Sequence, residues 1–170
     1  NSKTNYAYLE NEFDHDGDPF EMVAKFTIPQ SSMLEGSIFS QQYGIDPFYI
    51  FGTNASGGKA QKVCFYYSDN GSAWTYNEEL FTWEYGATYT LKCVWDGIGT
   101  YTISKLNSSD EWEVIKTITG KTAPTSGLRV NLNANQRQPT DFTFNGTVDL
   151  TKTYIKINDE YFFKYEASQD

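Results

Sequence analysis

The chain has 170 residues, of which 39% are hydrophobic, 17% aromatic and 21% charged, a composition that excludes intrinsic disorder and allows a real core. The net charge is -9, with 13 Lys and Arg against 22 Asp and Glu, so nucleic acid and anionic membrane surfaces are poor partners. Apolar runs are only a few residues long, so we expect no membrane span.

Apolar residues alternate with a period of two along most of the chain, which predicts β-strands. The pair Asp96-Gly97 predicts a hairpin turn. We expect at most a turn of helix near residues 77–81 and near Leu150. Residues 53–61 and 133–141 are predicted to be surface loops. Without a linker or a composition shift, the pattern favours one antiparallel all-β domain spanning residues 1–170. The expected strands cover residues 20–28, 37–42, 48–52, 62–68, 89–95, 100–106, 111–119, 127–133, 142–147, 153–157 and 160–165.

Residues for catalysis are scarce in this sequence. His15 is the one histidine, and the sequence has no G-x-S-x-G nucleophile elbow whose serine it could activate. No strand carries the alternating carboxylates of the β-sandwich glucanases, and no glycine loop has the spacing of a phosphate-binding loop. We therefore expect no enzyme activity. Cys64 and Cys93 are expected to be free, buried thiols, although a disulfide between adjacent strands stays open.

One acidic turn is a candidate metal site. Asp14, Asp16 and Asp18 have the alternating spacing found at the front of a calcium loop. The pattern departs from a full EF-hand loop, because Pro19 stands where glycine is wanted and Lys25 occupies the twelfth position. The alternative is a plain acidic turn before the strand that begins at Phe20. We expect no cofactor, with calcium as the alternative left open.

The aromatic surplus is the remaining signal for function. We expect most aromatic residues to be structural, with Trp74 and Trp112 capping hairpin ends over the core. Aromatic rings that remain exposed can stack on the apolar faces of sugars, while amide and guanidinium groups bond the hydroxyls, in line with the general design of binding sites. Candidate floor residues are Trp83, Tyr85, Tyr76 and Tyr49, and candidate polar residues, placed on outward-facing or loop positions, are Asn131, Asn133, Asn135, Gln136 and Arg137.

Three segments resemble the concanavalin A-like lectin and glucanase superfamily, in its laminin-G-like branch. They are residues 20–27, residues 89–112, and the closing run FNGTVDLTKTYIKIN at residues 144–158. The closing run is similar to the ending of such modules in phage tail proteins and in surface proteins of Gram-positive bacteria. Asp159 replaces the usual glycine of that ending, and residues 161–163 stand where tryptophans are common.

The resemblance implies a jelly-roll β-sandwich of two antiparallel sheets and a non-catalytic carbohydrate-binding module. Such a module would attach a phage tail or a bacterial surface protein to cell-surface polysaccharide, as part of a larger multidomain or virion assembly. We therefore expect a location that is extracellular, on a cell surface or on a virion. Two alternatives stay open, namely a structural or protein-docking domain of a virion or adhesin and a divergent glycosidase, because a fold alone does not define a function.

Overall fold

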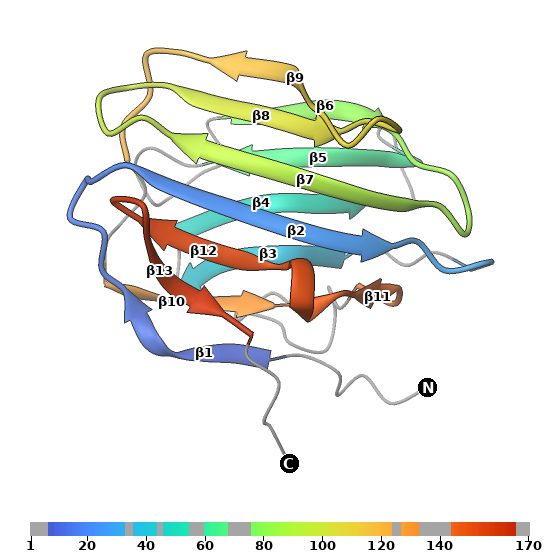
Figure 1. Cartoon of the computed structure of the whole chain (residues 1–170), viewed down its shortest axis with the longest axis horizontal. Coiled ribbons are helices and arrows are strands. Elements are labelled where there is room, and N and C mark those ends of the chain that lie inside the picture. The colour runs from blue at the N-terminus through green and yellow to red at the C-terminus, as the bar shows by residue number, and fades with distance from the viewer. Residues whose placement is uncertain are drawn as a thin grey trace.

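The computed structural model describes residues 7–32, 36–43, 46–54, 60–67, 76–123, 127–132 and 144–165. These residues form two β-sheets that lie one behind the other, with the strands of both sheets running in nearly the same direction (Figure 1). Every strand pairing within them is antiparallel. This arrangement is an aligned β-sandwich, so the predicted fold class is confirmed.

The first sheet lies at the back in Figure 1 and contains a four-strand meander from β3 to β6. Its described strands, in spatial order, are β1 (Ala7–Phe13), β10 (Leu128–Leu132), β3 (Gly36–Tyr43), β4 (Asp46–Asn54), β5 (Lys62–Tyr67) and β6 (Tyr76–Thr82). Because β1 and β10 come from opposite halves of the chain, this sheet is completed only when the two halves meet.

The second sheet lies at the front and contains the meander from β7 to β9. Its described strands, in spatial order, are β13 (Glu160–Lys164), β12 (Tyr154–Ile157), β2 (Phe20–Thr27), β7 (Thr88–Trp95), β8 (Tyr101–Leu106) and β9 (Trp112–Ile118). A short strand, β11 (Thr147–Val148), also pairs with β2. The chain thus passes from one sheet to the other between β6 and β7.

The core lies between the two sheets and is rich in aromatic rings. In β2 the alternate residues Phe20, Met22, Ala24 and Phe26 are all at most 2% exposed and belong to the core cluster. Trp95 of β7 donates through its ring nitrogen to the Gly17 carbonyl over 3.1 Å, so this buried indole is satisfied at the end of the sandwich. The alternate apolar residues of the β2 sequence therefore identify the face of this strand that packs into the core.

The local predictions missed one strand and were wrong at residues 77–81, at Trp112 and at residues 144–146, which precede β11 and are not in a strand. Residues 77–81, expected to hold at most a turn of helix, lie in strand β6, which pairs with β5 from Tyr76 to Thr82. Strand β1 was not predicted, because its acidic residues interrupt the alternation. Trp112 does not cap the core but lies 39% exposed on β9, with the Lys92 Nζ atom 4.4 Å from its ring centroid.

The predicted hairpin turn at Asp96-Gly97 is confirmed between β7 and β8. The Asp96 Oδ1 atom accepts hydrogen bonds from the backbone amides of residues 98, 99 and 100 at 2.8 to 2.9 Å. These bonds, led by the one from Thr100, lower the pKa of the Asp96 carboxyl to about 2. Gly97 has a φ of 82° and approaches the Pro19 ring closely, so a side chain would fit poorly there.

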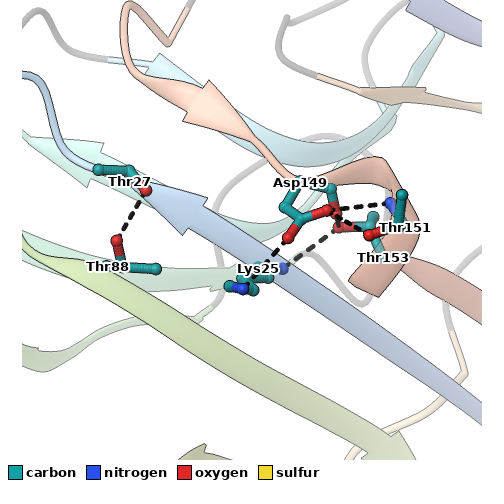
Figure 2. A network of polar contacts seen from close by, with 6 residues as sticks. All are labelled: Lys25, Thr27, Thr88, Asp149, Thr151 and Thr153. Carbon is teal, nitrogen blue, oxygen red and sulfur yellow. Dashed lines mark hydrogen bonds and ion pairs between the residues drawn. The ribbon is translucent and has the colours of Figure 1, made fainter.

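A polar network fixes the closing segment of the chain against β2 (Figure 2). The predicted helical turn near Leu150 is a short 3-10 helix, η2 (Leu150–Lys152). Asp149 caps it by accepting from the Thr151 amide at 3.1 Å and the Thr151 hydroxyl at 2.7 Å, and its other oxygen lies 3.1 Å from the Lys25 ammonium. The Thr151 hydroxyl bond, followed by the bond from Lys25, lowers the pKa of the Asp149 carboxyl.

Buried Thr153 links the same segment to the β2 backbone. Its hydroxyl donates to the Asp149 carbonyl at 2.8 Å and accepts from the Lys25 amide at 3.2 Å. Figure 2 shows the hydrogen bond between Lys25 and Thr153. The Asp149 amide in turn donates to the Lys25 carbonyl at 2.8 Å. The region that carries the family resemblance is thus held in place by its own polar residues.

Both cysteines are buried and free, as expected. Burial raises the pKa of the Cys93 thiol far above its usual range. No helix in the described part of the chain is long and apolar enough to cross a membrane.

Candidate functional site

One register row crosses the whole first sheet and carries a polar or aromatic residue at every position. Each residue in the row is the direct partner of the next on the neighbouring strand. The row, which we call the polar row, consists of Tyr8 on β1, Asn131 on β10, Ser40 on β3, Tyr49 on β4, Tyr66 on β5 and Asn77 on β6. Strands are spaced by about 4.8 Å, so such a row is about 24 Å long.

Three members of the polar row, Asn131, Ser40 and Tyr66, face away from the core. Asn131 lies between Val130 and Leu132, which are both in the core cluster, and Tyr66 directly follows the core residue Phe65. Because successive residues of a strand point to opposite faces, Asn131 and Tyr66 point to the outer face of the sheet. Ser40, as the register partner of Asn131, lies on the same face.

Asn131 is the most informative residue of the polar row. Its side chain is only 2% exposed although it lies outside the core cluster, and neighbouring Ser40 is 1% exposed. Within the described residues, the Asn131 Nδ2 atom has no hydrogen-bond partner. An unsatisfied buried donor costs about 1–3 kcal/mol, so pairing the Asn131 Nδ2 group with an acceptor would stabilise the molecule.

The residue types of the polar row define what it could bind. Amide groups donate and accept, hydroxyls do both, and tyrosine adds an aromatic ring. None of its six positions is an acid, a histidine or a cysteine, which are the usual ligands of metals and the usual groups of general acid–base catalysis. The row thus suits a neutral ligand with many hydroxyl groups.

Two of the predicted carbohydrate-binding residues are brought together here. Tyr49 and Asn131 occupy the polar row on either side of Ser40. Tyr76 is the partner of Tyr67, one position along from the row. Asn131 was expected to face outward and does so, but it is buried rather than exposed. Asn133, Asn135, Gln136 and Arg137 lie outside the described residues.

Trp83 is a correction to the prediction. It was the leading candidate for an exposed floor residue, but it is 2% exposed and belongs to the core cluster. Tyr85, two residues later, is 49% exposed and packs edge-on against the Trp83 ring with 5.2 Å between the centroids. Both residues follow β6 in the connection to β7, so Tyr85 alone of this pair presents a large surface to solvent.

Sequence reasoning missed Ser40 and Tyr66 as members of the site. The alternation of β5 already places Tyr66 opposite Phe65, so its outward position could have been inferred. Ser40 could not, because its place beside Asn131 depends on the pairing of β3 with β10, whose paired residues are 89 to 93 positions apart in sequence. Strand register between distant segments has no local sequence signal.

Calcium binding at the acidic turn of residues 14–18 stays a prediction. Asp14, Asp16 and Asp18 are all exposed, and the described part of the chain contains no group of three or more His, Cys, Asp or Glu placed to hold a metal ion. Asp18 instead accepts from the Asn158 amide at 2.5 Å. Buried His15 accepts from the Gly17 amide at 3.0 Å, so the turn is ordered by its own residues.

Comparison with known proteins gives a likeness of fold. No family model matches the sequence, and no curated protein matches it. The chain is similar to the enzymatically active domain of tailspike protein 2 from bacteriophage CBA120, with a TM-score of 0.65, 13% identity, and coverage of 92% of this chain and 24% of that one. Full-length tailspike protein 2 from an Escherichia coli O157:H7 bacteriophage gives a TM-score of 0.61, 12% identity, and coverage of 92% and 22%.

These identities establish a shared fold only. The chain spans less than a quarter of the length of either tailspike chain, so the likeness concerns one part of those larger proteins. The β-sandwich predicted from the sequence is thus also found among phage tail proteins.

Proposed function

We propose that the chain is a non-catalytic carbohydrate-binding module that attaches a phage tail or a bacterial surface protein to cell-surface polysaccharide. The binding surface would be the polar row on the outer face of the first sheet. The observation that carries this proposal is the buried Asn131 Nδ2 donor, which has no partner among the described residues. A sugar hydroxyl is a suitable acceptor for that donor.

Two further observations support the proposal. The row extends across six strands, which suits a chain of linked sugars better than a single small molecule. Its positions hold no carboxylate, whereas glycoside hydrolysis uses a pair of them, so binding without hydrolysis is favoured. The likeness to tailspike protein 2 supports the phage-tail setting as part of the same proposal.

The test is binding to a glycan array, followed by affinity electrophoresis with the polysaccharides that bind. Replacing Asn131 with Leu should weaken binding about tenfold or more, because the donor to the sugar is lost. The free energy of unfolding of this variant should stay within about 1 kcal/mol of the wild-type value. The substitution removes an unsatisfied buried donor together with the amide. Thr117→Val, an exposed change on β9 of the other sheet, is the matched control and should bind normally.

Two results would reject the proposal. One is a folded wild-type protein that binds no bacterial or plant polysaccharide. The other is an Asn131→Leu variant that binds as tightly as the wild type, which would place the site elsewhere on the molecule.

A further inference from the structure

The outer face of the second sheet carries lysines and aromatic rings side by side, on the side of the molecule opposite the polar row. On β12, Tyr154 and Lys156 alternate with the fully buried core residue Ile155, so both point outward. Tyr161 and Lys164 of β13 are their register partners. On β7, Lys92 lies between the core residues Leu91 and Cys93 and also points outward.

The lysine ammonium groups lie over the rings of this face. Lys156 and Lys164 are 5.0 and 4.9 Å from the Tyr161 centroid, and Lys156 is 5.7 Å from that of Tyr154. At the other end of the face, Lys92 is 4.4 Å from the Trp112 centroid. We call this set the basic strip: Lys92, Trp112, Tyr154, Lys156, Tyr161 and Lys164. It runs from β13 to β9, which are the two ends of the sheet in Figure 1.

The basic strip is a local excess of positive charge on an acidic chain of net charge -9. Glu21 lies within it, where its carboxylate accepts from the Tyr154 hydroxyl at 2.8 Å and lies 3.9 Å from the Lys92 ammonium. Lys156 and Lys164 form no salt bridge within the described residues. Glu21 is the register partner of Lys156 on β2, but its carboxylate is engaged by Tyr154 and Lys92, so the strip holds three lysines around one acid.

This arrangement holds the lysines in position before any ligand arrives. A lysine over an aromatic ring is attracted by the ring and keeps its charge accessible to solvent. Tyr161 and Trp112 stay 53% and 39% exposed, so the rings also offer surface to a ligand. Anionic groups are the natural partners of such ammonium pairs.

We propose that the basic strip binds an anionic polysaccharide, whose carboxylate or phosphate groups are held by Lys156 and Lys164 while Tyr161 contacts the sugars. This site is separate from the polar row and does not depend on it. A protein partner fits less well, because the cores of protein interfaces are depleted in lysine. Binding of a nucleic acid is the alternative that the oligothymidylate arm of the experiment tests.

The experiment is affinity electrophoresis of the whole chain through gels that contain one of four polymers. They are polygalacturonate for carboxylate, glycerol-phosphate teichoic acid for phosphate, neutral dextran, and single-stranded oligothymidylate. We expect retardation by polygalacturonate or teichoic acid and not by dextran, with the retardation lost in 0.5 M salt, at which exposed charges are screened. The polymer that retards the chain more strongly identifies the anionic group.

The decisive variant is the double substitution Lys156→Gln and Lys164→Gln, which removes two charges and leaves polar side chains one atom shorter. It should weaken binding to the anionic polymer about tenfold or more, since each lysine near an anionic surface contributes measurably. The matched control, Lys62→Gln with Lys121→Gln, removes the same charge from elsewhere and should change binding less than twofold. Circular dichroism should show both variants folded, since none of these four lysines is buried.

Several outcomes would overturn the proposal. They are no retardation by either anionic polysaccharide, retardation by dextran that the Lys156→Gln, Lys164→Gln variant loses as well, tighter binding of oligothymidylate, and unchanged binding of the anionic polymers by that variant. Sedimentation that shows a dimer dissolved by this double variant would assign the strip to self-association instead. An Asn131→Leu variant that no longer binds the polysaccharide recognised by the polar row, but still binds the anionic polymer, would show that the two sites are independent.

Discussion

Replacing Thr153 with Val removes one buried hydroxyl with almost no change in shape. The hydroxyl makes two hydrogen bonds, to the Asp149 carbonyl at 2.8 Å and from the Lys25 amide at 3.2 Å, and Thr153 is 1% exposed. Each such bond contributes about 1 kcal/mol net, and a donor left unpaired adds a penalty, so we expect a loss of about 2 kcal/mol. For a chain of this size that corresponds to a fall in Tm of about 4–8 °C.

The assay is urea unfolding followed by tryptophan fluorescence, with Thr153→Ser as the control. Serine keeps the hydroxyl and loses only a methyl group, so it should retain most of the stability that Val loses. If Val is as stable as the wild type, or if Ser is destabilised more than Val, the hydrogen bonds of Thr153 do not hold the closing segment. The contact of that segment with β2 would then depend on packing alone.

Three further predictions concern burial and charge. Trp83→Ala should lower the free energy of unfolding in urea by about 3–5 kcal/mol, and a stable variant would show that Trp83 is not a core residue. The pKa of Asp96 is depressed in the folded state, so its stabilisation is full above pH 4 and is lost as the pH falls toward 2. Thermal melts should show that the difference in Tm between the wild type and Asp96→Asn becomes smaller over that pH range. A constant difference in Tm would contradict this prediction. Buried Cys64 and Cys93 should react with a thiol reagent only after unfolding, so rapid reaction of the native protein would argue against their burial.

The strands were predictable where one face of a strand meets the core. In β2 the apolar residues at alternate positions define both the strand and its buried face. In β6 the run Glu78-Glu79-Leu80 resembles helix-forming sequence, and the pairing with β5 overrides that preference. Edge strands such as β6 and β1 accept polar residues, which explains why the alternation of apolar residues is weak in their sequences.

The candidate site was only partly predictable for a related reason. Asn131 and Tyr49 were selected by residue type, and their meeting across Ser40 depends on register between segments far apart in the chain. Trp83 was selected by type as well, but a tryptophan after a strand can turn inward or outward. Its burial is decided by tertiary packing, which the local sequence does not encode.

The edges of the sandwich bear on how the protein behaves when it is concentrated. In the described part of the chain β9 and β6 are outermost strands, and a salt bridge between Lys116 of β9 and Glu78 of β6 joins the two sheets there. An outermost strand exposes backbone groups that can recruit a strand from another molecule, and charged side chains oppose this. Lys116, Glu113 and the bulge between β8 and β9 therefore protect this edge from fibril-like stacking.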